Sequence, residues 1–296
     1  MDLTGVFAPV PTPFDDQDQV DIRRLKAAFA RWVNGPLTGF VVLGSNGEAA
    51  LMDEDESDRV IALTREAVPP GRTFLVGTGR ESTQGAIKAT KRAAALGADA
   101  VLVRTPGFFK SQMTNDAFVR HYTAVADASP VPVLLYNFTA VTGVNLLPAA
   151  VSRIATHPNV IGMKESGGDL AQITDLVTGT PQDFRVLSGS GSTFYPSLCA
   201  GVDGGILALA NVIPDACVRL YELFKKGKHD EARDLQQQIL PLAKLLGSVY
   251  GVAGLKAALK LAGCDVGVPR PPLAPVPESG VAALKEALAA CEKVAV

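Results

Sequence analysis

Short apolar segments that alternate with helical patterns constrain the fold of this chain more than any other feature. Eight such segments are rich in valine, leucine, isoleucine and phenylalanine and show little polar alternation. They occupy residues 6–10, 39–43, 73–77, 100–104, 131–136, 160–164, 184–188 and 204–209. Apolar runs of this length and pattern are typical of parallel strands that are covered on both faces.

Helical patterns separate these segments at residues 22–32, 55–67, 84–96, 115–128, 148–155 and 170–177. Asp53 and Ser82 precede two of them and are predicted N-caps. Eight β-then-α units in series predict an α/β fold, a (β/α)8 TIM barrel. The alternative is an open doubly wound sheet, but no G-x-G-x-x-G motif follows the first strand.

The alternation stops at about residue 224, and helical patterns follow at residues 231–246, 254–261 and 280–294. A proline-rich stretch at residues 268–277 separates the last two. We therefore predict a barrel domain over residues 1–224 and a small C-terminal helical domain, packed on the barrel, over residues 225–296.

Composition excludes several classes of function. A net charge of -2 gives no electrostatic basis for binding nucleic acid or an anionic membrane. No apolar run approaches the roughly 20 residues of a membrane span, and the first residues lack a secretory pattern. The three histidines are dispersed, which argues against a metal site. The four scattered cysteines, at positions 199, 217, 264 and 291, predict reduced thiols and a cytoplasmic protein.

Lys164 is the residue with the clearest chemical potential. It ends the buried segment at residues 160–164, where desolvation disfavours a charged side chain. The uncharged amine that this favours is the nucleophile required to form a Schiff base with a carbonyl. The alternative is a lysine at a strand end whose ammonium group reaches water.

Polar and glycine-rich pieces follow most of the strands and would gather at the C-terminal mouth of a barrel, where active sites of this fold are built. Tyr136 ends the fifth strand, so the spacing of adjacent strands, about 5 Å, puts its phenol within reach of Lys164. Residues 44–48, which include Ser45, Asn46 and Gly47, follow the second strand and could hold a carboxylate. Taken alone, Tyr136 could be a packed core tyrosine and this loop a plain turn.

Together these segments resemble the dihydrodipicolinate synthase / N-acetylneuraminate lyase family of class I, pyruvate-dependent aldolases. The matching pieces are residues 5–14, the loop 44–48, Thr105-Pro106 followed by an aromatic pair, Tyr136-Asn137 with Thr142-Gly143, and residues 162–166. They span nearly the whole chain and keep their order and their places on the strands.

The resemblance implies a TIM barrel with a helical C-terminal domain, a homotetramer, and a lysine imine with pyruvate that needs no cofactor and no metal. It implies that Lys164 is the Schiff-base nucleophile and that Tyr136 is the acid/base residue. Ser45 and Asn46, next to Gly47, match positions that bind the pyruvate carboxylate, with Ser45 also in the proton relay. Ile206 matches a position that lines the pyruvate pocket.

Three departures bear on the substrate. The synthases usually carry two threonines where this chain has Ser45-Asn46, and an arginine where it has Val141. They also carry a tyrosine pair, one of which completes the relay of a neighbouring subunit, where this chain has Phe108-Phe109. Phenylalanine cannot relay a proton. The relay is therefore expected to be shorter or to use water.

Residues 80–84, 121–127, 162–169 and 208–212 resemble the 4-hydroxy-2-oxoglutarate aldolase branch of the family. We therefore predict cleavage of a 4-hydroxy-2-oxoacid, with 4-hydroxy-2-oxoglutarate giving pyruvate and glyoxylate. The alternatives are an aldolase for 2-keto-3-deoxy sugar acids, dihydrodipicolinate synthesis, and a non-catalytic protein that binds keto acids. A structural barrel with an incidental lysine is the remaining alternative.

Overall fold

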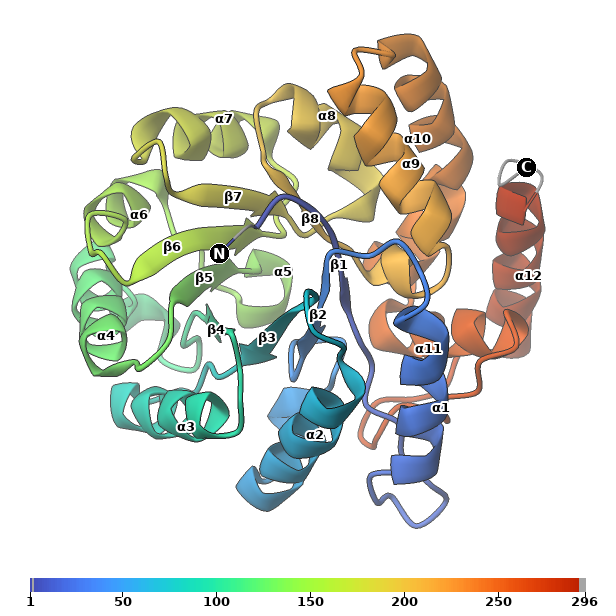
Figure 1. Cartoon of the computed structure of the whole chain (residues 1–296), viewed down its shortest axis with the longest axis horizontal. Helices are drawn as coiled ribbons and strands as arrows, with labels where there is room; N and C mark the ends of the chain where they lie inside the picture. Colours follow the sequence, from blue (N-terminus) through green and yellow to red (C-terminus); the bar gives the residue numbers. More distant parts are fainter. Residues whose placement is uncertain (2, 293–296) are drawn as a thin grey trace.

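Eight parallel strands close into a barrel in the computed structural model, which describes Met1 and residues 3–292 (Figure 1). Each strand pairs with the next in sequence, and β8 pairs with β1 to close the ring. The strands are β1 (Gly5–Pro9), β2 (Gly39–Val42), β3 (Thr73–Gly77), β4 (Ala100–Arg104), β5 (Val133–Asn137), β6 (Val160–Glu165), β7 (Arg185–Ser188) and β8 (Gly204–Ile206). The predicted TIM barrel is confirmed, and the open sheet is excluded.

Helices form a layer around the strands (Figure 1). They are α1 (Ile22–Trp32), α2 (Glu54–Ala67), α3 (Thr83–Ala95), α4 (Asn115–Ala128), α5 (Thr139–Thr142), α6 (Pro148–Ile154), α7 (Leu170–Gly179), α8 (Phe194–Cys199) and α9 (Pro214–Lys225). Asp53 caps α2 by accepting a hydrogen bond from the backbone of Glu56, and Ser82 caps α3 by accepting one from Gly85. Both predicted N-caps are therefore confirmed.

The core has two parts because successive side chains of a strand point to opposite faces. One set of alternate side chains fills the barrel interior and includes Phe7, Leu75, Leu134 and Leu187. The other set packs outward against the helices. Leu3, which precedes β1, is almost fully buried in the interior cluster. The barrel is thus filled with side chains, which leaves its mouth as the place for chemistry.

The C-terminal tail lies against one side of the barrel (Figure 1). It consists of α10 (His229–Lys244), a π-helical turn η5 (Leu245–Val249), α11 (Gly251–Leu261) and α12 (Glu278–Glu292). Helix α10 packs on α8 and α9, and α11 packs on the 3₁₀ turn η4 (Ala208–Asn211). The three predicted tail helices are confirmed to within a few residues, except for positions 293–294, which lie outside the described residues. A domain boundary at residues 224/225 stays a prediction, and it falls at the end of α9.

Two predicted strand boundaries are wrong. The segment 204–209 was expected to be extended throughout, but β8 ends at Ile206 and the chain turns into η4. Asn211 holds this turn by donating hydrogen bonds of 3.0 Å to the carbonyls of Pro9 and Ala208. The segment 131–136 begins as a strand only at Val133, because Pro132 has no N–H to give to a ladder.

No helix among the described residues is long and apolar enough to cross a membrane. Cys199 is exposed, whereas Cys217, Cys264 and Cys291 are buried, and all four are free of disulfides. Within the described part of the chain no three His, Cys, Asp or Glu side chains gather in a way that could hold a metal ion.

Candidate active site

Lys164 and Tyr136 face each other at the mouth of the barrel because β5 and β6 pair in register at these two residues. The amine of Lys164 lies 3.3 Å from the phenol oxygen of Tyr136 and 4.3 Å from the centroid of its ring. Both side chains are buried, with exposed fractions of 5% for Lys164 and 3% for Tyr136. No carboxylate among the described residues forms an ion pair with Lys164. The amine is therefore held against a proton-exchanging group and is not tied up in an ion pair.

Gly189 has no side chain, and this makes room for the side chain of Lys164. A Cβ at this position would collide with the hydroxyl of Ser166 and would lie 2.9 Å from Cε of Lys164. The strand end after β7 therefore requires a glycine next to the amine-bearing side chain.

Ser45 extends the Lys164–Tyr136 contact to the second strand. Its hydroxyl lies 3.3 Å from the phenol oxygen of Tyr136, so the amine, the phenol and the hydroxyl form one chain of polar groups. Tyr136 also stacks on Phe138, with ring centroids 6.0 Å apart, which orients the phenol. Such a chain can pass a proton between the amine side and the loop after β2.

The loop that contains Ser45, Asn46 and Gly47 is a strained turn. Leu43 and Glu48, at its two ends, adopt φ angles of 54° and 56°, in the left-handed region that non-glycine residues rarely occupy. Strain of this kind costs roughly 1–3 kcal/mol per residue and persists only where the surroundings enforce it. Gly47 accepts a hydrogen bond of 2.7 Å from the hydroxyl of Thr12, and a Cβ there would lie 2.9 Å from the nitrogen of Leu43.

Ile206 lies on β8 and is fully buried in the interior cluster that also contains Tyr136. It pairs with Phe7 across the β1–β8 seam. The structure thus brings Lys164, Tyr136 and Ser45 into direct contact and puts Ile206 in the same interior layer. The side chain of Asn46 makes no hydrogen bond to another described residue and stays available.

Glu165 is a buried carboxylate that the sequence analysis missed as part of the site. It follows Lys164, and its side chain points to the opposite face of the strand, where it accepts hydrogen bonds from Asn137 (2.7 Å), the backbone of Gly167 (2.5 Å) and Gln172 (3.1 Å). Burial raises the pKa of Glu165, and these donors oppose the rise. Asn137 and Glu165 directly follow Tyr136 and Lys164 and pair across the same two strands. This spacing could have predicted the hydrogen bond between their side chains.

Two buried hydroxyls near the mouth have no hydrogen-bond partner among the described residues. They belong to Ser166, two residues after Lys164, and to Thr193. A Cβ on Gly168 would lie 3.5 Å from the Thr193 hydroxyl and 3.9 Å from that of Ser190, so these groups line one region after β6 and β7. Buried hydroxyls are normally paired, so this region is suited to a polar ligand.

Phe108 and Phe109 are exposed to solvent. Their rings are 77% and 68% exposed and meet edge to face at 5.1 Å. Glu81 holds this segment by accepting hydrogen bonds of 2.9 Å from the backbone of Gly107 and of Phe108, and it pairs with Arg104 at 2.7 Å. The fixed backbone presents both rings outward. Val141 is also 62% exposed.

Comparisons with known proteins agree with this geometry. The model of the dihydrodipicolinate synthetase family matches residues 2–291. A 4-hydroxy-tetrahydrodipicolinate synthase from Exiguobacterium is 34% identical, with 97% of each chain covered. A probable mitochondrial 4-hydroxy-2-oxoglutarate aldolase from Emericella nidulans is 38% identical, with 96% of this chain and 94% of the relative covered. The dihydrodipicolinate synthase of Acinetobacter baumannii, solved in complex with pyruvate, superposes with a TM-score of 0.93 at 28% identity, over 98% of this chain and all of that one.

Proposed function

The chain belongs to the dihydrodipicolinate synthetase family and is a lyase of the class I, pyruvate-dependent aldolase type, and on this premise we propose that it cleaves 4-hydroxy-2-oxoglutarate into pyruvate and glyoxylate. Enzymes of this family work through a lysine Schiff base with pyruvate and need no external cofactor. The observation that carries the proposal is the chain of contacts, 3.3 Å each, from the Lys164 amine through Tyr136 to Ser45.

In the proposed reaction the amine of Lys164 attacks the C2 ketone of the substrate, and loss of water leaves a protonated imine. Tyr136 removes the proton from the C4 hydroxyl, the C3–C4 bond breaks, and its electrons flow into the imine. Glyoxylate leaves, and the remaining enamine takes a proton at C3. Hydrolysis of the imine then releases pyruvate and restores the amine.

Ser45, Asn46 and Gly47 are proposed to hold the C1 carboxylate, which all substrates of this kind share. Such an anchor binds the substrate and the transition state alike, so it contributes positioning. Ser45 is also proposed to exchange protons with Tyr136, and water beyond Ser45 completes the relay, since Phe108 and Phe109 have no group that could. Ile206 is proposed to line the pyruvate methyl side of the pocket.

Lys110 supports a dicarboxylate as the substrate. A Cβ on Gly143 would lie 2.7 Å from the Lys110 amine, so this cation lies against the Val141–Gly143 segment. Synthases are expected to have an arginine in this segment, where the present chain has Val141. We propose that Lys110 supplies the positive charge for the second carboxylate of 4-hydroxy-2-oxoglutarate.

A second candidate is an aldolase for 2-keto-3-deoxy sugar acids, and the unpartnered hydroxyls of Ser166 and Thr193 favour it because they suit a polyhydroxyl chain. Dihydrodipicolinate synthesis is favoured by the names of relatives such as that from Exiguobacterium. It is opposed by Val141. The phenylalanine pair does not choose between the two activities, because a tyrosine is expected there in the hydroxyoxoglutarate aldolases as well. A non-catalytic keto-acid binding protein is the alternative if the shortened relay does not function.

The test is a comparison of three reactions catalysed by the purified protein. Pyruvate release is measured from 4-hydroxy-2-oxoglutarate and from 2-keto-3-deoxygluconate, and pyruvate consumption with aspartate semialdehyde. We expect kcat/KM to be highest for 4-hydroxy-2-oxoglutarate by at least about tenfold. Lys110→Met should raise KM for this dicarboxylate roughly tenfold and leave the sugar acid unaffected. A higher value for another substrate would reassign the activity, and pyruvate binding without any turnover would support the binding protein.

We further propose a homotetramer and, because none of the four cysteines forms a disulfide, a reducing compartment such as the cytoplasm. The exposed Phe108-Phe109 pair supports an assembly, because two adjacent exposed rings on a braced backbone are typical of a surface that another chain covers. The relative from Emericella nidulans is named as mitochondrial.

A further inference from the structure

A buried cluster of charges joins the C-terminal tail to the loop that is proposed to hold the substrate carboxylate. Glu48, the last residue of this loop, is 3% exposed. One of its carboxylate oxygens lies 2.6 Å from the amine of Lys256 on α11, and both side chains are only 1% exposed. The other oxygen accepts a hydrogen bond of 2.7 Å from the backbone N–H of Arg270, 222 positions away in the sequence. Both oxygens of Glu48 are therefore held by the tail.

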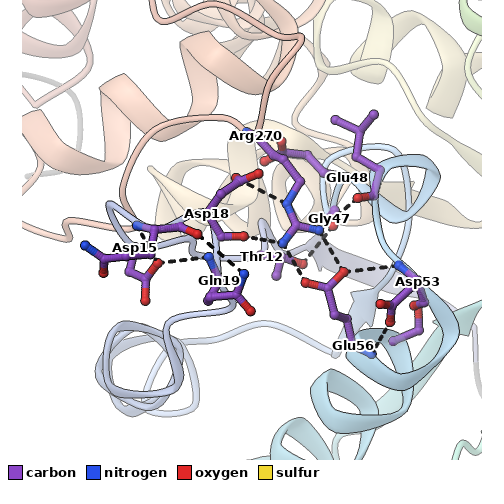
Figure 2. A network of polar contacts seen from close by, with 12 residues as sticks. Thr12, Asp15, Asp18, Gln19, Gly47, Glu48, Asp53, Glu56 and Arg270 are labelled. Atoms are coloured by element: carbon purple, nitrogen blue, oxygen red, sulfur yellow. Dashed lines mark hydrogen bonds and ion pairs between the residues drawn. The ribbon is translucent and has the colours of Figure 1, made fainter.

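The side chain of Arg270 also contacts several groups in the same region (Figure 2). Its guanidinium makes a bidentate contact with Glu56, at 2.8 and 2.6 Å, and lies 3.3 Å from the carboxylate of Asp18. It also donates hydrogen bonds to the carbonyls of Leu51 (2.8 Å) and Asp18 (2.5 Å). Glu56 closes the capping box of α2, the helix that follows the loop. Arg270 thus clamps both the end of the loop and the helix after it.

The ring of Phe14 lies under both cations. The Lys256 amine is 4.5 Å from its centroid, and the Arg270 guanidinium is 4.2 Å from it. The Lys256 amine also donates a hydrogen bond of 3.0 Å to the carbonyl of Val268. Burial lowers the pKa of Lys256, and the carboxylate of Glu48 acts in the opposite direction. The Glu48 oxygen that faces Lys256 has this ion pair as its contact and no hydrogen-bond partner among the described residues.

A buried cluster of this kind is a poor source of stability, because desolvation offsets most of the Coulomb attraction. Its geometry, however, is specific. The Lys256 amine and the backbone N–H of Arg270, both from the tail, hold the carboxylate of Glu48. Glu48 in turn ends a turn in which two non-glycine residues have left-handed φ angles. Strained turns persist only where the surrounding structure enforces them. The contacts that the tail makes with Glu48 hold one end of the loop in this strained conformation. The hydrogen bond from Thr12 to Gly47 holds the neighbouring residue.

We propose that Lys256 and Arg270 are positioning residues for the carboxylate anchor, and that they act through Glu48 to hold Ser45, Asn46 and Gly47 in place. The inference rests on the proposed function, because it takes this loop as the site that binds the keto-acid carboxylate. The C-terminal tail is then a part of the active site although none of its side chains touches the substrate.

The proposal predicts a specific defect when the buried cation is removed. In Lys256→Met the carboxylate of Glu48 loses its ion pair, and the loop at residues 44–48 relaxes. Pyruvate should then bind Lys164 more weakly, with the pyruvate concentration for half-maximal borohydride trapping raised roughly tenfold to hundredfold. The trapped fraction at saturating pyruvate should stay close to that of the unmodified protein, because the amine itself is unchanged.

Two readouts on the full-length protein separate positioning from a general loss of structure. The first is the half-maximal pyruvate concentration for trapping, and the second is hydrogen exchange of the peptide over residues 44–52 against peptides elsewhere in the barrel. The matched control is Lys260→Met, which removes an exposed lysine from the same helix α11, one turn further on. Arg270→Lys keeps the charge but loses the bidentate geometry, and it serves as the milder variant if Lys256→Met does not fold.

The expected result is faster exchange confined to residues 44–52 and weaker pyruvate trapping in Lys256→Met and Arg270→Lys, with no change in Lys260→Met. Folded variants with unchanged half-maximal pyruvate concentration and unchanged loop exchange would overturn the proposal, as would exchange raised uniformly over the barrel. If the unmodified protein traps no pyruvate, the proposed function fails by itself, and the exchange comparison still decides whether the tail fixes the loop.

Discussion

The contact between the Lys164 amine and the Tyr136 phenol follows from the register of two neighbouring strands. Tyr136 pairs with Lys164 across β5 and β6, so both side chains point into the same layer of the barrel. Because this layer is buried, the two polar groups have few partners other than each other and Ser45. The proposed reaction therefore depends on three neighbouring groups, which are one amine, one phenol and one hydroxyl.

Tyr136→Phe tests the division of roles among these three groups. The variant keeps the ring that packs beside Lys164 but removes the group that exchanges protons. We expect turnover to fall roughly 10²–10⁴-fold, while pyruvate is still trapped on Lys164. Steady-state kinetics and borohydride trapping measure the two effects separately. Turnover within a few-fold of the unmodified protein would refute the acid/base role.

His121 predicts a pH dependence of stability that is independent of catalysis. Burial lowers the pKa of His121 to about 4, with Arg104 acting in the same direction and Glu81 against it. The unfolded chain, with a histidine pKa of about 6.5, therefore binds more protons between these values, so stability is complete above pH 6.5 and falls as the pH drops towards 4. The loss between pH 7.5 and pH 5 should be about 2 kcal/mol.

His121→Asn is the matching variant, because asparagine can keep the 2.9 Å contact that Nδ1 of His121 makes with Thr83 without titrating in this range. Urea unfolding at pH 7.5 and pH 5 measures how much of the free energy of unfolding is lost between the two pH values. This loss should be smaller by about 2 kcal/mol in the variant than in the unmodified protein. The carboxylates whose pKa is lowered, such as Glu54 and Glu56, lose their contribution only below about pH 4.3 and do not interfere. Equal losses in the two proteins would contradict the prediction.

At the scale of elements, closure of the barrel depends on a close approach between β1 and β8. Gly5 pairs with Gly204 across this seam, and Gly5 has a φ of 90°. A Cβ on Gly204 would collide with the carbonyl oxygen of Gly5 and lie 2.8 Å from its nitrogen. Backbone atoms cannot move aside as the end of a side chain can, so the seam requires glycine.

Gly204→Ala should therefore destabilise the protein by about 2–3 kcal/mol. Gly179→Ala is the control, since a Cβ at the end of α7 meets nothing within 4 Å, and its effect should stay within about 1 kcal/mol. Chemical denaturation of both variants makes the comparison. Equal stabilities would show that the seam can adjust.

The elements also show what the sequence could and could not predict. Apolar runs without alternation predicted all eight strands, and adjacent strand ends predicted that Lys164 and Tyr136 meet. The early end of β8 was not predictable, because it depends on Asn211 donating hydrogen bonds to Pro9 and Ala208. The tail cluster was missed for the same reason, because Glu48 and Arg270 are 222 positions apart in the sequence and only the fold brings them together.

At the scale of the whole molecule, we predict that the exposed Phe108-Phe109 pair forms part of an interface in the proposed homotetramer. The native mass should be about four times the chain mass of 30.9 kDa. Replacing both phenylalanines by serine should lower this mass, because the loss of apolar area weakens the interface. Light scattering on both proteins measures it. A monomeric unmodified protein would contradict the assembly, and an unchanged mass in the double variant would assign the interface to another surface.

The account as a whole depends on a covalent bond between Lys164 and the substrate, and borohydride trapping with pyruvate tests it most directly. Mass spectrometry of the intact chain and of its peptides identifies the modified residue, and Lys164→Met is the control. The account predicts a pyruvate-sized adduct on the peptide that contains Lys164 and none in the control. An unmodified chain, or an adduct on a different lysine, would contradict the Schiff-base mechanism proposed for this protein.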